Sequence, residues 1–226
     1  MRIAIVADVH GNLVALEAVL ADLARKAPDL VVHGGDLAFS GPRPAECLDR
    51  IRELGWPGVL GNTDQALETH RDRPAVGWIR ERVGEERNGW LQALPLEWRH
   101  HDEIGLVHAV PGDLWKVVQP EVDDAELRAV YGPLGSRLAV YCHIHRPYIR
   151  SLGELTVANT GSVGLPFDGD PRASYLLVSD GVPETQRVSY DIERAVREIE
   201  ESGHPAASEI AGIYRSGRPS SKPLGA

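Results

Sequence analysis

Three short aliphatic runs, each followed by polar residues that can bind a ligand, most constrain the fold of this chain. The runs have the composition of buried strands and lie at residues 3–7, 30–32 and 58–60. Asp8 and His10 follow the first run, Asp36 follows the second, and Asn62 follows the third. Because open α/β sheets hold their ligands beyond the carboxyl ends of the strands, we expect these four side chains to share one site at a sheet edge.

The remaining patterns predict an α/β (α+β) fold in which most elements are short. Apolar residues at helical spacing predict helices over 13–23, 45–54, 123–131 and 192–199, with a further helical turn or two afterwards. A helical insertion broken at Pro74, Gly84 and Gly89 is expected over 65–94, flanking or covering the site. Strands are expected as a hairpin at 96–99 and 104–107, a single strand at 137–141, and a β-meander at 148–151, 154–158, 173–179 and 184–190.

Composition indicates an ordinary globular protein that is not a general nucleic-acid-coating protein. The 226 residues are 42% hydrophobic and 25% charged, which fits a single domain over 1–215 followed by a flexible tail at 216–226. The formal charge of −9 argues against a stable nucleic-acid complex. We expect neither a membrane helix nor a signal peptide. Two cysteines make no disulfide framework, so we expect a cytoplasmic location.

Three histidines extend the set of candidate ligands. His108 follows the run 104–107, and His143 and His145 follow the run 137–141. Taken singly, each is more typical of a buried hydrogen-bonding histidine than of a metal ligand. Taken together with the residues after the first three runs, the histidines become candidate ligands. The full set is Asp8, His10, Asp36, Asn62, His108, His143 and His145. This donor set suits Mn²⁺, Fe²⁺, Ni²⁺ or Zn²⁺, and seven donors suit two ions if Asp36 bridges them.

The ordered pattern D-x-H, G-G-D, G-N-x-D, H and H-x-H resembles that of the calcineurin-like metallophosphoesterases, and among them the small bacterial and archaeal YfcE-like phosphodiesterases. The resemblance runs from Met1 to about Tyr190 and implies a four-layer αββα sandwich of two mixed β-sheets. It also implies two divalent ions, Mn²⁺ by preference, and attack on phosphorus by a hydroxide that bridges them. One ion would take Asp8, His10, Asp36 and His145, and the other Asp36, Asn62, His108 and His143.

Two positions depart from the family pattern. Many relatives have a histidine directly after Gly-Asn, where this chain has Thr63 followed by Asp64. Threonine can donate a hydrogen bond to phosphate but cannot act as a general acid near neutral pH. Cys142 stands where relatives usually have glycine before H-x-H. The predicted catalytic residues are Asp36, Asn62, Thr63 and Asp64.

These observations predict a metal-dependent phosphoesterase for phosphodiesters or activated phosphomonoesters, acting on a small phosphorylated substrate. A phosphatase for nucleotides, dinucleoside polyphosphates or phosphoproteins is an alternative, because specificity would come from residues 65–94 and 110–120. A non-catalytic scaffold, as in a retromer subunit that resembles this fold, is a further alternative. A homo-oligomer is compatible with the sequence.

Several other residues allow more than one interpretation of their role. Asn159 and Ser162 either support a ligand loop or reach phosphate, with a structural turn favoured. Arg146 either binds a phosphate oxygen or is an ordinary surface residue. Four tryptophans either form a base-stacking platform or, twice as readily, pack in the core: Trp78, Trp90, Trp98 and Trp115.

Overall fold

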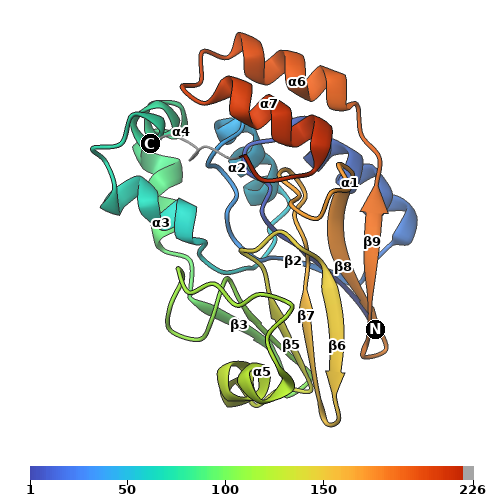
Figure 1. The fold of residues 1–226 in the computed structure, drawn as a ribbon. Helices are drawn as coiled ribbons and strands as arrows, with labels where there is room; N and C mark the ends of the chain where they lie inside the picture. The colour runs from blue at the N-terminus through green and yellow to red at the C-terminus, as the bar shows by residue number, and fades with distance from the viewer. Residues whose placement is uncertain (221–226) are drawn as a thin grey trace.

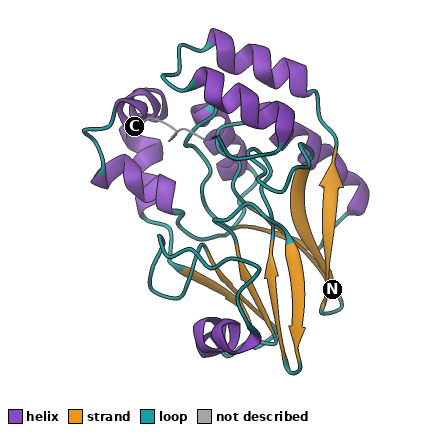
Figure 2. Ribbon diagram, in the orientation of Figure 1, coloured by secondary structure: helices purple, strands orange, loops and turns teal. Residues whose placement is uncertain are grey.

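The computed structural model describes residues 1–220 and has two mixed β-sheets flanked by helices (Figures 1 and 2). The strands are β1 (Arg2–Val6), β2 (Leu30–His33), β3 (Glu97–His100), β4 (Ile104–Val107), β5 (Leu138–Tyr141), β6 (Tyr148–Leu152), β7 (Leu155–Asn159), β8 (Ala173–Ser179) and β9 (Val182–Val188). The helices are α1 (Leu13–Lys26), α2 (Pro44–Glu53), α3 (Asn62–Thr69), α4 (Pro74–Gln92), α5 (Asp124–Tyr131), α6 (Ile192–Glu201) and α7 (Ala207–Ser216), with a 3₁₀ turn, η1 (Gly132–Leu134).

The two sheets have four and five strands. The first sheet has the order β2-β1-β8-β9, in which β1 and β2 run parallel and β8 is antiparallel to both β1 and β9. The second has the order β3-β4-β5-β7-β6, in which β4, β5 and β7 run parallel and the two edge strands antiparallel. Each sheet therefore contains a parallel pair, β1–β2 or β4–β5, whose carboxyl ends can present side chains on one side.

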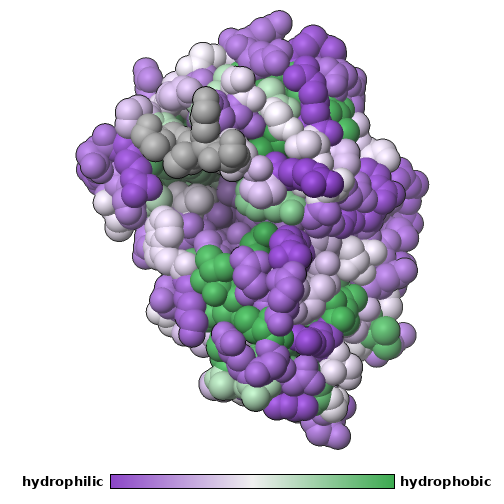
Figure 3. Space-filling view, in the orientation of Figure 1, coloured by the Kyte–Doolittle hydropathy of each residue, from purple (hydrophilic) through white to green (hydrophobic). Residues whose placement is uncertain are grey.

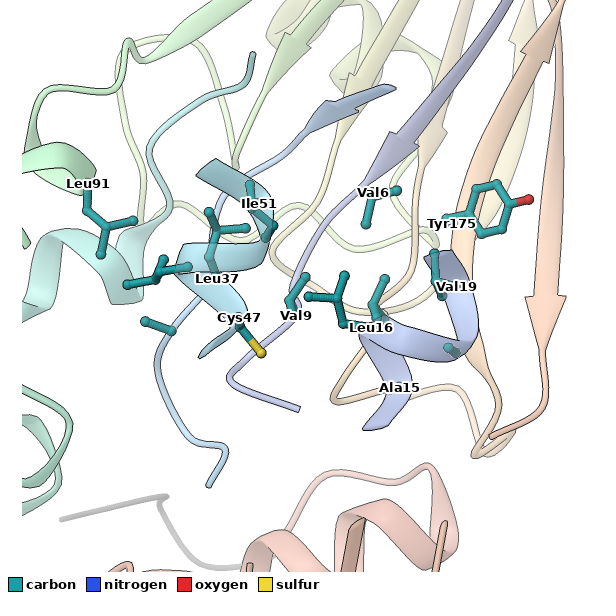
Figure 4. Close-up of a cluster of buried hydrophobic side chains, with 14 of the residues drawn as sticks. Val6, Val9, Ala15, Leu16, Val19, Leu37, Cys47, Ile51, Leu91 and Tyr175 are labelled. Carbon is teal, nitrogen blue, oxygen red and sulfur yellow. The ribbon is translucent and has the colours of Figure 1, made fainter. Parts of the chain in front are cut away.

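Alternation along the strands builds the predicted four-layer sandwich. In β1, Ile3 and Ile5 face the core between the sheets, whereas Ala4 and Val6 face the helices. The strands of the second sheet alternate in the same way between the core shared by the two sheets and an outer core beneath α5. On the outside of the first sheet, α1 and α2 bury residues such as Leu16 against it (Figure 4). The layers are helix, sheet, sheet and helix.

The C-terminal helices α6 and α7 form an additional pair against α1. Their buried side chains share one hydrophobic cluster with Val14 and Leu165. In Figure 1 this pair lies at the top and α5 at the bottom, at opposite ends of the molecule. The surface over α6 and α7 is largely hydrophilic, whereas hydrophobic residues gather nearer the middle of the same face (Figure 3). No helix in the described range 1–220 is both long and apolar enough to cross a membrane.

The predicted strand at 58–60 is wrong. The segment forms only one bridge, between Gly58 and His33, and then turns away toward α3. Gly58 lies so close to β2 that a Cβ there would meet the His33 ring at 2.3 Å. Past this contact the Leu60 N–H donates to the carbonyl of Pro95 instead of to β2, so pairing with β2 stops after one residue.

The predicted β-meander is also wrong as a continuous unit. Strands β6 and β7 form a hairpin in the second sheet, whereas β8 and β9 form a hairpin in the first. Residues 160–172 cross between the sheets and pass the β1 loop, where Val163 and Gly164 donate to the carbonyls of Ala7 and Asp8. The crossing segment therefore connects the two sheets and is bonded to the loop after β1.

The helical insertion agrees with expectation in outline. Pro74 begins α4, and Gly84 kinks it with a φ of 74°, but Gly89 does not break the helix. At the C-terminus the expected helical turn or two is α7, ten residues long, so Ser216 belongs to a helix and not to the predicted tail. Residues 221–226 of that tail lie outside the described residues.

Candidate active site

The two sheets bring all seven candidate ligand residues to one edge. Asp8 and His10 follow β1, and Asp36 follows the parallel strand β2. His108 directly follows β4, and His143 and His145 follow its parallel neighbour β5, while Asn62 is the first residue of α3. The predicted grouping is therefore present, although the third run reaches the site through a loop and not from a strand end.

Five of these residues have a positive φ angle, a backbone conformation that residues other than glycine rarely adopt. Their φ angles are 55° for Asp8, 50° for His10, 54° for Asp36, 64° for His143 and 55° for His145. Only a few per cent of non-glycine residues occupy this left-handed region, and each costs roughly 1–3 kcal/mol. Strain concentrated at one place is characteristic of functional sites, where surrounding contacts hold it in place.

Backbone hydrogen bonds between the loops supply those surrounding contacts. The N–H groups of Asp8, His10 and Gly11 donate to the carbonyls of Gly35, Asp36 and Leu37 at 2.9–3.0 Å. These bonds continue the β1–β2 pairing into the two loops. Glycine is required nearby, because a Cβ on Gly61 would lie 2.1 Å from Asp36 Oδ1.

One cluster consists of Asp8, His10, Asp36 and His145, whose potential ligand atoms all lie within 4.8 Å of one another. His10 Nε2 is 3.1 Å from His145 Nε2 and 3.7 Å from Asp36 Oδ2. His145 Nε2 is 3.3 Å from Asp8 Oδ1. All four side chains are buried. The cluster matches the first ligand set that the family resemblance implied.

The remaining candidates meet on the other side of Asp36. Asn62 Oδ1 lies 2.8 Å from His108 Nε2 and 3.0 Å from His143 Nδ1. His108 Nε2 is also 3.5 Å from Asp36 Oδ1. The two carboxylate oxygens of Asp36 thus face different groups of side chains, which is the arrangement expected of a bridging ligand.

Backbone carbonyls fix which nitrogen each imidazole presents. The Nδ1 atoms of His10, His108 and His145 lie 2.6–2.8 Å from the carbonyls of Phe39, Gly34 and Leu165 respectively. A carbonyl accepts only from an N–H, so the neutral rings carry their proton on Nδ1 and turn the Nε2 lone pair inward. His143 is reversed, with its Nδ1 turned inward, 3.0 Å from Asn62 Oδ1.

Burial favours the neutral form of three of the site imidazoles, those of His10, His143 and His145. Desolvation lowers the pKa of His145 to about 4. Desolvation, with His108 nearby, lowers the pKa of His143 to about 4. Desolvation and the adjacent His145 lower the pKa of His10 as well. Neutral imidazole is the form that binds metal, because its lone pair is free.

The two carboxylic acids among the candidate ligands, Asp8 and Asp36, differ in the direction of their pKa shifts. Burial raises the pKa of Asp8 to about 7. Burial also opposes ionisation of Asp36, but the His108, His10 and His143 side chains and the Thr63 N–H outweigh it and lower that pKa. The Asp36 carboxylate is thus the more readily ionised of the two, and a further positive partner would favour ionisation of Asp8.

The donor groups fit divalent metal ions. Both carboxylate oxygens of Asp8 are buried and accept no hydrogen bond from any described residue. The inward lone pairs of His10 and His145 face one another at 3.1 Å. A cation between these atoms would relieve both the desolvation of Asp8 and the repulsion of the lone pairs. Oxygen and imidazole donors suit a borderline ion such as Mn²⁺ or Zn²⁺.

A pocket of about 250 Å³ opens onto the two clusters. Its floor includes His10, Asp36, Asn62, His143 and His145, and its walls are largely apolar or aromatic. The wall residues are Phe39, Ser40, Thr63, Ala66, Arg73, Val76, Trp115, Leu165 and Phe167. The helical segment predicted to flank the site, residues 65–94, supplies three of these, from α3, α4 and the turn between them.

The two residues after Asn62 have different surroundings. Thr63 lines the pocket, and its buried hydroxyl has no hydrogen-bond partner among the described residues. Asp64 does not line the pocket; its carboxylate accepts from the N–H groups of Leu37 and Ala38 at 3.1–3.4 Å. Burial, with Asp36 nearby, raises the Asp64 pKa to about 7. Asp64 therefore supports the loop that carries Asp36.

Asn159, Ser162 and Cys142 have supporting positions around the site. Asn159 donates to the carbonyl of Cys142 at 2.6 Å and accepts from Gly161 N–H at 2.9 Å. Ser162 donates to the Asp8 carbonyl at 2.7 Å. Both side chains thus bond to the backbone beside the ligand loops, which agrees with the interpretation that they support a ligand loop. Cys142 is buried in the core between the sheets against Gly34, where a Cβ would meet its Sγ at 2.3 Å.

Arg146 lies outside the pocket that opens onto the ligand clusters. Its guanidinium pairs with Glu121 at 2.6 Å and donates to Gln119 at 3.1 Å. It lines a larger neighbouring depression of about 880 Å³ that also includes His143 and Phe167. The contacts of Arg146 therefore agree with the interpretation that it is an ordinary surface residue.

Sequence reasoning did not single out three residues that line the pocket: Phe39, Arg73 and Phe167. The Phe167 ring stacks on the His145 ring, with centroids 4.4 Å apart. Arg73 precedes α4, and its guanidinium makes no ion pair with any carboxylate of residues 1–220. All three lie in or beside loops that have no hydrophobic period, so no sequence pattern marked them.

The calcineurin-like phosphoesterase superfamily domain model matches residues 1–180. The chain belongs to this superfamily. It is also 30% identical, over 87% of its length and 91% of the relative, to protein MJ0912 of Methanocaldococcus jannaschii. Phosphodiesterase YfcE of Escherichia coli K12 is 27% identical over 80% of this chain and 89% of the relative, which supports placement in the YfcE-like group.

Solved structures agree with this assignment. The crystal structure of a metallophosphoesterase from Sphaerobacter thermophilus is 30% identical and covers 96% of this chain and 100% of its own, with a TM-score of 0.81. Protein PH1004 of Pyrococcus horikoshii OT3 has the same fold, with a TM-score of 0.85 at 19% identity over 97% of this chain and 99% of its own. The phosphoesterase is accordingly a hydrolase of phosphoesters, and the scaffold alternative is set aside.

Proposed function

We propose that this phosphoesterase hydrolyses phosphodiesters, or phosphomonoesters with good leaving groups, using two divalent metal ions that share Asp36. The observation that carries the proposal is the position of Asp36 between two groups of donor atoms on the pocket floor. One group is Asp8, His10, Asp36 and His145, and the other is Asp36, Asn62, His108 and His143.

The bound ions would act as Lewis acids toward the phosphoryl group and lower the pKa of a coordinated water toward neutrality. The protein's own groups orient the substrate. The Thr63 hydroxyl is placed to donate a hydrogen bond to a phosphoryl oxygen, and Arg73 adds a positive charge at the pocket wall. Mn²⁺ is our first choice of metal, with iron, nickel and zinc as alternatives for the same donors.

The preference for good leaving groups follows from the residues that line the pocket. Every histidine among the described lining residues belongs to the ligand set, and Thr63 cannot donate its proton as an acid near pH 7. No other described lining residue is an acid with a pKa near neutrality. A leaving group that needs protonation therefore receives little help, whereas a stable anion such as p-nitrophenolate needs none.

The pocket volume favours a small phosphorylated substrate, since about 250 Å³ admits a phosphoryl group and part of its alcohol but no folded segment of a protein. We assign the enzyme to the cytoplasm, where its two buried thiols, Cys47 and Cys142, would remain reduced. We do not expect it to form a stable complex with nucleic acid.

Chromogenic esters test this proposal. Metal-free protein should be inactive, and Mn²⁺ should restore turnover of bis-p-nitrophenyl phosphate at a rate equal to or above that of p-nitrophenyl phosphate. Glycerol 2-phosphate, a monoester with a poor leaving group, should be a weak substrate. Turnover that needs no metal, or a preference for glycerol 2-phosphate, would overturn the proposal.

A further inference from the structure

Trp115 differs from the other four tryptophans of the chain. Trp56, Trp78 and Trp90 pack against the core outside the first sheet, and Trp98 packs against the core between the sheets. Trp115 instead leaves 42% of its surface exposed and lines the active-site pocket. A large aromatic side chain that is partly exposed beside this pocket can bury more of its surface when a ligand packs on it.

The indole is held in a fixed orientation. Its Nε1–H donates to Gln65 Oε1 on α3 at 3.0 Å, and its ring lies 5.4 Å from that of His70. The Trp115 N–H donates to Asp113 Oδ1 at 2.8 Å, and Asp113 and Val110 exchange two backbone hydrogen bonds at 3.1 Å. An aromatic surface that is already ordered loses little entropy when a ligand packs on it.

Trp115 and His143, a predicted metal ligand, line the same pocket. The aromatic surface and the ligand clusters therefore face one cavity. A phosphoester bound at the clusters would extend one arm along the pocket wall toward the indole. Among the described residues of that wall, Arg73 carries the only charge, and it has no ion-pair partner there.

We propose that Trp115 is the platform on which a nucleobase of the substrate stacks, so that this enzyme selects nucleoside phosphoesters. The inference rests on the proposed function for the position of the phosphate. A nucleobase suits the site because it offers a flat π face to the indole while its polar edge stays in water. An exposed platform rimmed by solvent meets both needs, whereas a buried slot would leave the polar edge unpaired.

Calorimetric titration of the Mn²⁺-loaded enzyme with two matched phosphate monoesters tests this platform. AMP and ribose 5-phosphate carry the same phosphate and sugar and differ in the base. We expect AMP to bind about tenfold more tightly, which corresponds to ~1.4 kcal/mol. Trp115→Leu should reduce this advantage to less than about twofold, whereas Trp115→Phe, which keeps a π face, should retain most of it.

Val117→Ala is the matched control, because Val117 is exposed in the same loop and does not line this pocket; its AMP advantage should equal that of the wild type. Gln65→Ala tests the platform without changing the indole, and should weaken AMP binding but not ribose 5-phosphate binding. Equal affinity of wild type for the two ligands, or an advantage that persists in Trp115→Leu, would overturn the proposal.

A third comparison, between phenyl phosphate and methyl phosphate, separates a nucleobase from any flat ring. An advantage for phenyl phosphate as large as that of AMP would overturn the assignment to nucleobases. Because affinity and hydrolysis are measured separately, the two proposals fail separately. A preserved AMP advantage in an enzyme that hydrolyses no ester with Mn²⁺ would support the platform and contradict the proposed function.

Discussion

The floor and the wall of the active-site pocket are built in different ways. The floor residues are held by backbone, with five of the seven candidate ligands in a left-handed conformation and the loops after β1 and β2 tied by hydrogen bonds. The wall residues project from α3, α4, the turn between them and the loops after β2, β4 and β7. Trp115 is the most exposed aromatic among them. The floor is thus suited to one chemistry, and the wall can change substrate preference without disturbing that chemistry.

The largest expected effect comes from the floor. Asp36→Asn should lower kcat/KM by at least about 10³-fold for every ester, because Lewis-acid catalysis contributes several kcal/mol and ~1.4 kcal/mol is tenfold. Asp102→Asn, an exposed carboxylate at the β3–β4 turn, is the matched control and should keep full activity. Steady-state kinetics with bis-p-nitrophenyl phosphate measures both, and comparable activity of the two variants would contradict the distinction between floor and wall.

The second effect concerns His33, a buried histidine at the end of β2 whose ring nitrogens have no described hydrogen-bond partner. Burial lowers its pKa to about 4. Below its unfolded pKa of about 6.5 the unfolded chain binds a proton that the folded chain does not. The free energy of unfolding should therefore fall as pH drops from about 6.5 toward 4, by up to ~3 kcal/mol from this residue.

Urea unfolding at pH 7.5 and pH 5 in chelator measures this effect. Wild type should lose more stability between the two pH values than His33→Leu, because both proteins share the titrations of the ligand histidines. Equal losses in the two proteins would show that His33 does not contribute.

The third effect is at the boundary between floor and wall. Thr63→His should raise kcat on the order of tenfold for esters with poor leaving groups and change p-nitrophenyl esters little, because general-acid catalysis is worth 10²–10⁴-fold when well placed. Thr63→Val, which removes the hydroxyl, is the control and should not show this selective gain. An equal gain for good and poor leaving groups would indicate that proton donation is not what the site lacks.

The smallest effect belongs to the wall. Arg73→Gln should raise KM about 3- to 10-fold and leave kcat within about twofold, because a solvent-exposed hydrogen bond to a charged group is worth roughly 1 kcal/mol. Arg71→Gln removes an equally exposed guanidinium that pairs with Glu68 away from the pocket, and should leave KM unchanged. A similar KM in both variants would remove Arg73 from the substrate wall.

The same division explains how much the sequence could predict. Strand ends are visible in sequence as apolar runs that stop at polar residues, and parallel strands bring their ends together, so the grouping of Asp8, His10 and Asp36 follows from pattern alone. The run at 58–60 has the same pattern yet is not a strand, because Leu60 N–H donates to the carbonyl of Pro95 and only one bridge to β2 forms. Local pattern carries no information about such a contact.

The wall was less predictable for a physical reason. Its residues come from loops and helix ends, where no periodicity links a side chain to a face. Trp115 has the same sequence neighbourhood of mixed polarity as the core tryptophans, and only the tertiary structure separates it from them. The sequence also could not predict that the β6–β7 and β8–β9 hairpins belong to different sheets, since an antiparallel hairpin has the same sequence pattern in either sheet.

The most direct test of the central claim, two metal sites that share Asp36, is the metal content of the protein. Wild type stripped with chelator and then equilibrated with excess Mn²⁺ should bind two equivalents per chain, measured by calorimetric titration and by elemental analysis. Asp36→Asn should bind less than one equivalent under the same conditions, and Asp102→Asn should bind two. A fully active wild type that binds at most one equivalent, or an Asp36→Asn protein that still binds two, would contradict the account.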